Sequence, residues 1–366
     1  IFAKEGDQPF GGGSGNIAIG NDVLGDQGPT TGDNNFAAGG RTLRYLTSGG
    51  SNIGIGSSAF NFLTDHSHNI GLGINAGYAV KGEYNIFLGA YAGFGGRELS
   101  PYTDVDNNVG IGNRALNLVL NSYNVAVGYY AGKNATSGSG NTFIGSQAGE
   151  GATSAPYGTG GNNTFIGNQA GKDFTTGYQN TGVGYLAIHN ITTGYDNNFI
   201  GNQSGHVITT GYYNEGIGHK ALNSLTTGIG NIGIGAYAGA HGARNYSIFM
   251  GYQAGYYDGG AGMVVLGQQA GQYTAGGNSI LLGKEAGRYV SGSNNVMLGY
   301  NAGLGNSVQA TTATMTNVHS NVGVGSYTLY QLGAGMNNSV AVGNAAGQNT
   351  TGSYNTFVGS QAGYGG

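Results

Sequence analysis

The chain has 366 residues, of which 78 are glycine and four are proline, and its formal net charge at pH 7 is −4. Collagen is excluded because the glycines do not fall at every third position, and a charged share of only 8% disfavours a nucleic-acid partner. Cysteine is absent, which excludes a disulfide framework. Aliphatic residues recur in phase with glycine, so the composition favours an ordered chain over a disordered one.

In chain order, residues 1–15 form a lead-in, and we expect the sequence to be a piece of a longer chain because it opens on Ile1. Residues 16–366 repeat one phrase, Asn-x-x-x-Gly-x-x-Ala, twenty times. We call the glycine of each copy the marker glycine and number it position 0. The marker glycines are Gly20, Gly39, Gly56, Gly73, Gly89, Gly112, Gly128, Gly145, Gly167, Gly184, Gly201, Gly218, Gly235, Gly251, Gly267, Gly283, Gly299, Gly325, Gly343 and Gly359.

Most intervals between marker glycines are 16 or 17 residues long. This period is too short for a helical hairpin or a propeller blade, but it suits one coil of a β-solenoid. The sequence therefore predicts an all-β fold, namely an elongated parallel β-solenoid or β-roll of about 20 short coils. The coils would form a single domain over residues 16–366.

Three longer intervals predict polar loop insertions in this domain, at residues 94–106, 150–161 and 304–320. Solenoids accept insertions on one face, and such loops often carry binding sites. The alternative is that these insertions only decorate the surface.

Each repeat has a regular pattern around its marker glycine. Position −1 is aliphatic in every copy and position −3 is mostly Ile, Val or Thr, so the two share one face of a predicted strand of about five residues. We interpret −1 as an aliphatic core position. Position +3 is usually alanine, where we expect two backbones to approach closely.

Positions −2 and +4 compensate one another in size. Each of the six Phe residues at −2 is followed by glycine at +4, and most glycines at −2 are followed by a bulky residue at +4. This exchange of large for small predicts that both positions lie in one buried layer. Both faces of the strand are then apolar, and we expect the second face to contact other chains in a homotrimer, either intertwined or side by side.

Asparagine occupies position −4 in most copies. Stacked coils would place these side chains close enough for a ladder of amide hydrogen bonds. The predicted ladder residues are Asn52, Asn69, Asn85, Asn141, Asn163, Asn180, Asn214, Asn231 and Asn355.

Thr-Thr-Gly-Tyr segments recur every 17 residues and should stack into a surface ribbon. The candidate ribbon residues are Thr176, Tyr178, Thr193, Tyr195, Thr210 and Tyr212. One interpretation is a flat surface that binds ice or glycans; the other is that Thr and Gly only complete the turns of each coil.

The repeats resemble known fibre proteins. Residues 141–149 read Asn-Thr-Phe-Ile-Gly-Ser-Gln-Ala-Gly, recur nearly unchanged at 163–171 and 355–363, and resemble repeats of bacteriophage tail fibres. Residues 16–20 and 339–343 are similar to the head repeats of trimeric autotransporter adhesins. Both resemblances imply a trimeric, parallel β-solenoid or β-roll stalk outside the cell, on a virion tail fibre or on a cell surface.

Three further motifs suggest ligands. His66-Ser67-His68 resembles the motif by which some phage fibres hold a metal ion on their axis, but surface histidines are the simpler interpretation. Asp104 and Asp106 could contribute to a calcium site or be solvated charges. The Gly-x-Gly-x-x-Ala phrase beginning at Gly110 looks like a dinucleotide fingerprint, yet it lies in phase with the solenoid and packing explains it.

No catalytic triad or paired carboxylates can be nominated, so we expect no enzyme, cofactor or metal. The sequence favours a structural and adhesive fibre shaft, as in a phage tail fibre that presents a receptor-binding tip. The alternatives are a bacterial surface adhesin or filament subunit, a glycan- or ice-binding solenoid, and a depolymerase tailspike. The expected partners are further copies of the chain and a cell-surface glycan or protein receptor, without nucleic acid or membrane insertion.

Overall fold

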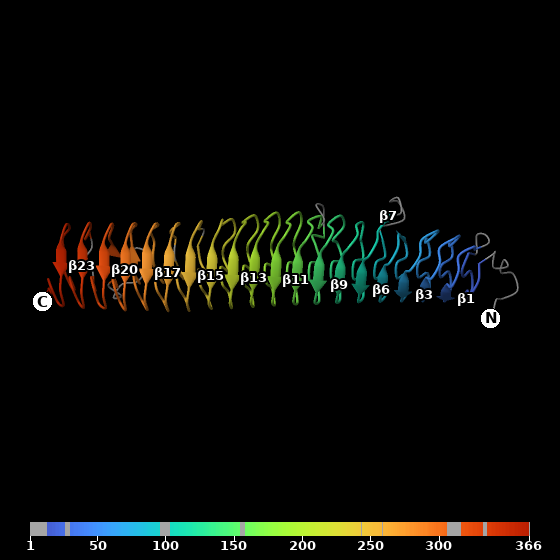
Figure 1. The fold of residues 1–366 in the computed structure, drawn as a ribbon, viewed down its shortest axis with the longest axis horizontal. Helices are drawn as coiled ribbons and strands as arrows, with labels where there is room; N and C mark the ends of the chain where they lie inside the picture. Colours follow the sequence, from blue (N-terminus) through green and yellow to red (C-terminus); the bar gives the residue numbers. More distant parts are fainter. Residues whose placement is uncertain are drawn as a thin grey trace. The chain divides into compact units, whose positions relative to one another are not determined.

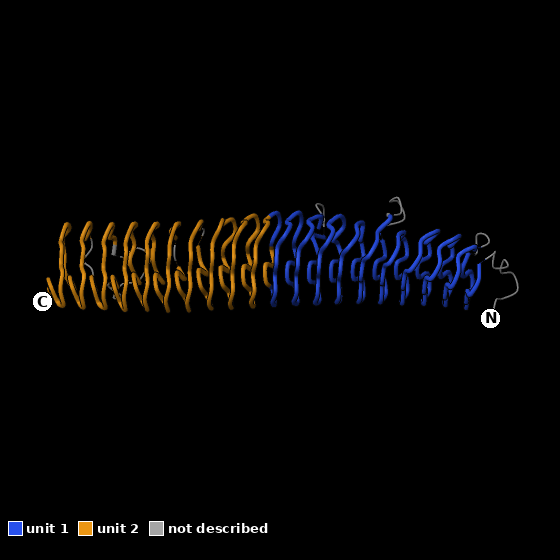
Figure 2. The backbone as a smooth tube through the Cα atoms, viewed as in Figure 1, with its two compact units in different colours: residues 1–186, 191–193 blue, residues 187–190, 194–366 orange. Residues whose placement is uncertain are grey.

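The computed structural model describes residues 13–25, 30–95, 103–153, 158–242, 244–257, 259–305, 316–331 and 335–365. All regular elements in these ranges are β-strands, and no helix occurs there. The chain divides into two compact units, residues 1–186 with 191–193 (unit 1) and residues 187–190 with 194–366 (unit 2; Figure 2). Each unit is a parallel β-solenoid (Figure 1).

Unit 1 contains ten of the strands that end at a marker glycine. They are β1 (Ile17–Ile19), β2 (Phe36–Ala38), β3 (Ile53–Ile55), β4 (Ile70–Leu72), β6 (Ile86–Leu88), β8 (Val109–Ile111), β9 (Val125–Val127), β10 (Thr142–Ile144), β11 (Thr164–Ile166) and β12 (Thr181–Val183). Neighbouring strands pair in parallel with the repeats in register, so that Phe143 of β10 lies opposite Phe165 of β11.

Unit 2 contains ten equivalent strands with the same pairing. They are β13 (Asn198–Ile200), β14 (Glu215–Ile217), β15 (Ile232–Ile234), β16 (Ile248–Met250), β17 (Val264–Leu266), β18 (Ile280–Leu282), β20 (Val296–Leu298), β22 (Val322–Val324), β23 (Val340–Val342) and β24 (Thr356–Val358). Each covers positions −3 to −1 of its repeat. The strands are therefore three residues long, shorter than the five expected from the sequence.

The marker glycine ends each strand for two physical reasons. Its φ is positive, for example 134° at Gly167, in a region that side chains with a Cβ rarely adopt. A Cβ built on Gly167 would also lie 2.4 Å from the carbonyl oxygen of Gly184, the marker glycine of the next coil. Glycine is thus required both for the backbone turn and for the close stacking of successive coils.

The interior is built from positions −2, +3 and +4. Phe143 and Ala148 are fully buried, and a Cβ on Gly149 would lie 2.2 Å from the Phe143 ring. The size compensation between −2 and +4 is therefore a direct contact. It also extends between coils, because a Cβ on Gly71 or on Gly77 of one coil would clash with Phe60 of the preceding coil.

The predicted aliphatic core at position −1 is wrong. Side chains at −3 and −1 lie outside the coil; Ile17 and Ile19 of β1 are 46% and 47% exposed. Successive residues of a strand point to opposite sides, so when −2 fills the interior, −3 and −1 must face outward. We call the outward-facing side chains at −3 and −1 the strand face.

A further buried column lies at position +7, which the sequence analysis did not identify. Leu63 and Ile191 of unit 1 and Ile208 and Leu225 of unit 2 are fully buried there. The signal was present as the aliphatic residue before the Thr-Thr pairs, at a spacing of 17 between Ile191, Ile208 and Leu225. These residues add a further apolar position to the interior of each unit.

The insertions leave and rejoin the coils at their corners. After the insertion at 94–106 the chain returns as β7 (Thr103–Asp104), which pairs with β5 (Val80–Lys81). After the insertion at 304–320 it returns through β21 (Thr316–Asn317), which pairs with β19 (Val290–Ser291). The insertion at 150–161 rejoins by a parallel bridge between Ala135 and Gly158. Residues 96–102, 154–157 and 306–315 of these insertions lie outside the described residues.

Candidate functional site

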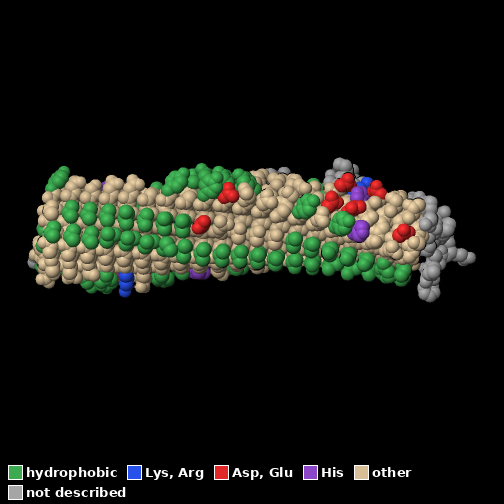
Figure 3. All heavy atoms as spheres, in the orientation of Figure 1, with side chains coloured by type: hydrophobic (Ala, Val, Ile, Leu, Met, Phe, Trp, Pro, Cys, Tyr) green, Lys and Arg blue, Asp and Glu red, His purple; other side chains and the backbone are tan. Residues whose placement is uncertain are grey.

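The strand face is largely apolar in each unit, and Figure 3 shows rows of hydrophobic side chains. Position −1 is aliphatic in all twenty repeats. The most exposed members in unit 1 are Ile17, Ile19, Ile53, Ile55, Leu72, Ile111 and Ile144. The most exposed members in unit 2 are Ile200, Ile217, Met250, Ile280, Val324, Val340, Val342 and Val358. Aligned apolar surface of this extent is typical of interaction sites.

Five consecutive repeats of the sequence have a polar residue at −3. Thr142, Thr164 and Thr181 occupy −3 in unit 1, and Asn198 and Glu215 occupy it in unit 2. Position −1 remains aliphatic in all five of these repeats. Glu215 is the sole charged residue at −3 or −1 of any repeat. The strand face therefore has a local composition change that could fix the register of a partner.

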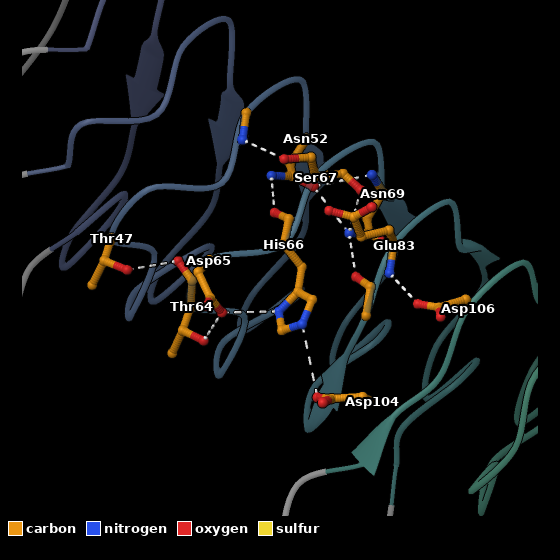
Figure 4. Close-up of polar contacts among 12 residues, drawn as sticks. Thr47, Asn52, Thr64, Asp65, His66, Ser67, Asn69, Glu83, Asp104 and Asp106 are labelled. Carbon is orange, nitrogen blue, oxygen red and sulfur yellow. Dashed lines mark hydrogen bonds and ion pairs between the residues drawn. The ribbon is translucent and has the colours of Figure 1, made fainter.

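The asparagines at −4 form buried hydrogen-bonded ladders. The Asn163 side chain donates to the Asn141 side-chain oxygen over 3.2 Å and to the Gly177 carbonyl over 2.9 Å. Its own side-chain oxygen accepts the backbone N–H of Asn180 at 3.0 Å and the Asn180 amide at 3.1 Å. The same pattern joins Asn52 to Asn69 (Figure 4). These side chains satisfy backbone groups at the start of each strand.

The remaining predicted ladder residues have equivalent positions. The backbone N–H groups of Asn85, Asn214 and Asn231 each donate to the side-chain oxygen of the asparagine in the preceding repeat. Asn355 instead donates its backbone N–H to the Ser339 hydroxyl at 3.1 Å. Ser339 shows that serine can supply the acceptor in place of asparagine. The ladder is structural, since its side chains are buried and directed at other repeats.

The predicted ribbon residues divide between the units. In unit 1, Thr176, Tyr178 and Thr193 are exposed. In unit 2, Tyr195 and Tyr212 stack with ring centroids 4.7 Å apart and Thr210 is exposed.

The aromatic part of the ribbon in unit 2 is extended by Tyr213 and Tyr246, which are 57% and 69% exposed. Tyr213 packs edge-on against both Tyr195 and Tyr212. This patch therefore offers aromatic surface and phenol hydroxyl groups.

His66 and His68 have different surroundings. The two imidazole nitrogens of His66 lie 3.1 Å from Asp65 Oδ1 and 3.8 Å from Asp104 Oδ1, as Figure 4 shows. His68 instead stacks on Tyr84, with ring centroids 4.8 Å apart. Within the described ranges no three His, Asp or Glu side chains are arranged to hold a metal ion.

The two aspartates proposed for a calcium loop also separate. Asp104 faces His66, whereas Asp106 Oδ1 accepts the backbone N–H of Glu83 at 2.7 Å. Asp106 therefore stabilises a coil corner. A hydrogen bond from Thr64 lowers the pKa of neighbouring Asp65, and the positive field of His66 adds to this effect against the opposing effect of burial.

The apparent dinucleotide fingerprint lies within the sheet. Gly110 belongs to β8, which pairs directly with β9, and no helix follows in this part of the described chain. A Cβ on Gly110 would lie 3.0 Å from the Phe87 ring. Glycine at this position is therefore explained by packing in the interior.

Unit 1 also holds a cluster of cationic and aromatic side chains that was not predicted from the sequence. It comprises Arg114, Tyr129, Tyr130 and Lys133, which follow the marker glycines Gly112 and Gly128 and lie off the strand face. The sequence did contain a signal, because basic residues are rare in this chain. Arg114 occupies one repeat, and the next repeat holds both the Tyr129-Tyr130 pair and Lys133.

Comparison with known proteins adds no relative: no family model, no curated protein and no solved structure matches this chain. A search of the described residues for a helix that is long and apolar enough to span a bilayer finds none.

Proposed function

We propose that this chain is a non-enzymatic segment of a fibre shaft, which assembles with two further copies of itself through the strand face. The biological setting that we propose is a phage or phage-like tail fibre, whose shaft holds a receptor-binding tip away from its base. The observation that carries the proposal is the aliphatic residue at −1 in every repeat, outside the coil.

Folding of a single chain does not account for this pattern. The interior is filled by −2, +3, +4 and +7, so the residues at −1 could be polar without leaving a cavity. The side chains at −1 stay partly exposed in the single chain, with Ile19 at 47% and Ile217 at 45%, and the exposed part would gain about 25 cal/mol per Å² if a partner covered it. A partner with the same repeat spacing supports burial along the whole face, and another copy of this chain has that spacing.

Parallel copies around one axis would bring equal repeats together. Cyclic symmetry places the same surface of each chain at the axis and closes the assembly. The number three rests on the resemblance of the repeats to trimeric fibres. The polar stretch at −3, ending at Glu215, would disfavour copies that are shifted by several repeats, because it would then face apolar partners.

Light scattering of the purified chain tests this proposal. We expect a mass of three chains for the natural sequence. Replacing Ile200 and Ile217 together by lysine places charges on the strand face and should shift the mass towards one chain. The matched control replaces Asn202 and His219 by lysine; both residues are exposed, two positions further along the same repeats and off the strand face.

The control carries the same added charge and should retain the mass of three chains. A single-chain mass for the natural sequence would overturn the proposal. So would equal behaviour of the two double variants, because the strand face would then have no special role in assembly.

A further inference from the structure

Arg114 lies at the centre of a compact polar and aromatic cluster in unit 1. Its guanidinium carbon is 5.5 Å from the centre of the Tyr91 ring and 5.7 Å from that of the Tyr130 ring. One guanidinium nitrogen donates to the Tyr130 hydroxyl at 3.1 Å. Tyr91, Arg114 and Tyr130 are all at position +2 of their repeats, so the repeat itself brings them side by side.

Lys133 and Glu150 hold Tyr130 in place. The Lys133 ammonium lies 4.3 Å from the centre of the Tyr130 ring and 3.6 Å from Glu150 Oε1. Glu150 Oε2 accepts the side-chain amide of Gln147 at 2.9 Å. Both oxygens of this buried carboxylate are thus engaged, and Lys133 is neutralised by it.

Arg114 has no such partner. Among the described residues no carboxylate lies within ion-pair distance of its guanidinium, and a guanidinium carries five N–H donors, of which Tyr130 takes one. Beside it, Tyr129 stacks on Tyr130 with ring centroids 3.9 Å apart and remains 50% exposed. The cluster therefore offers an uncompensated, fork-shaped cation next to an exposed aromatic ring.

We propose that this cluster, Arg114 with Tyr129 and Tyr130, binds a carboxylate-bearing glycan. The guanidinium fork matches the two oxygens of a carboxylate and can donate two parallel hydrogen bonds to them. The exposed Tyr129 ring provides a flat apolar surface for the C–H face of the adjoining pyranose, and its phenol oxygen can accept a hydrogen bond from a sugar hydroxyl.

The charge distribution favours an acidic glycan over a nucleic acid. A nucleic acid would require a row of unpaired cations to follow its phosphates, whereas this cluster has one, and the chain carries 12 basic against 16 acidic residues. A single carboxylate next to a pyranose ring needs one cation and one aromatic surface, which is what the cluster supplies.

This inference is independent of self-association. The cluster belongs to a single chain and follows the marker glycines, so it lies off the strand face. Loss of glycan binding therefore leaves the predicted mass of three chains unchanged, and the two proposals fail separately.

Isothermal titration of the full chain with tetragalacturonate tests the inference. We expect binding to the natural chain and none to a neutral tetrasaccharide of glucose or to acetate. Arg114→Gln should weaken tetragalacturonate binding by about tenfold, the loss expected for a charge-assisted hydrogen bond. Tyr129→Ser should weaken it as well. Arg114→Lys, which keeps the charge and loses the fork, should bind more weakly than the natural chain.

Lys220→Gln is the matched control. Lys220 is also at +2, its ammonium lies 5.7 Å from the centre of the Tyr237 ring, and its removal changes the net charge by the same amount. This variant should bind like the natural chain, and thermal unfolding of every variant confirms that it is folded. Absence of tetragalacturonate binding, equal binding of the neutral sugar or of acetate, or equal loss in Lys220→Gln and Arg114→Gln would each overturn the inference.

Discussion

The inner and outer residues of the same short strand obey different rules. In β10, Phe143 is fully buried and its size is matched by Gly149, whereas Ile144 next to it is 39% exposed. Across the repeats the inner position ranges from glycine to phenylalanine, while the outer position −1 is always aliphatic. The side chain at −2 therefore varies in volume, whereas the side chain at −1 keeps its apolar character.

This difference separates the positions that fill the interior from the positions that we propose contact another copy of the chain. A closed interior needs a constant total volume, so large and small residues can exchange between −2 and +4. A surface in water has no such requirement, and its aliphatic residues point to a partner.

Changing a marker glycine should have the largest effect on the inner side. Gly167→Ala introduces a Cβ that would lie 2.4 Å from the Gly184 carbonyl oxygen, at a φ of 134°. We expect a loss of about 4 kcal/mol in the free energy of unfolding, measured by denaturant titration. Gly259→Ala is the control, because nothing lies within 4 Å of its Cβ position. Similar stabilities of the two variants would contradict the stacking of marker glycines.

Overfilling the interior should have the next largest effect. Ala148 at +3 is fully buried beside Phe143. Ala148→Phe should lower the free energy of unfolding by about 3 kcal/mol, because a packed core cannot accept a second ring without moving its backbone. A melting temperature close to that of the natural chain would show that +3 does not face inward.

The asparagine ladder should show a graded effect. Asn163→Ala removes side-chain bonds to Asn141, Gly177 and Asn180 and should cost about 2 kcal/mol in denaturant titration. Asn163→Ser should cost about half as much, because a serine hydroxyl at −4 can still accept the next backbone N–H, as Ser279 does from Asn295 at 3.0 Å. Equal losses in both variants would argue against the acceptor role.

Acidification should have the smallest effect. Burial lowers the pKa of His206 below its ordinary 6.5, and the charges of His189 and Lys220 lower it further. Folding therefore favours the neutral imidazole: the stabilisation is complete above pH 6.5 and is lost as the pH falls towards the lowered pKa. We expect a lower melting temperature at about pH 5.5 than at about pH 7.5. His206→Gln should reduce the difference, whereas His219→Gln at an exposed position should not; a difference unaffected by His206→Gln would refute this assignment.

Much of the fold could be predicted because the residue types that recur in each repeat follow directly from contacts in the interior. The marker glycine reflects a stacking contact that recurs from coil to coil, and the pair Phe143 and Gly149 reflects a contact that recurs in the six repeats with Phe at −2. The burial of −1 was predicted wrongly, because period-two alternation places −1 and −3 on one face without saying which face is the interior. The cluster around Arg114 was missed because it forms between repeats, where side chains 16 residues apart become neighbours.

Cross-linking through the strand face tests whether copies of the chain contact one another there. The natural chain has no cysteine, so Ile217→Cys provides a single thiol on the strand face and Thr210→Cys provides one at an exposed position off it. Parallel copies in register bring equal positions together at the axis. With a short bismaleimide at low protein concentration, we predict a covalent dimer for Ile217→Cys and none for Thr210→Cys. Equal cross-linking of both variants, or none in either, would contradict the assignment of the strand face as the contact between copies.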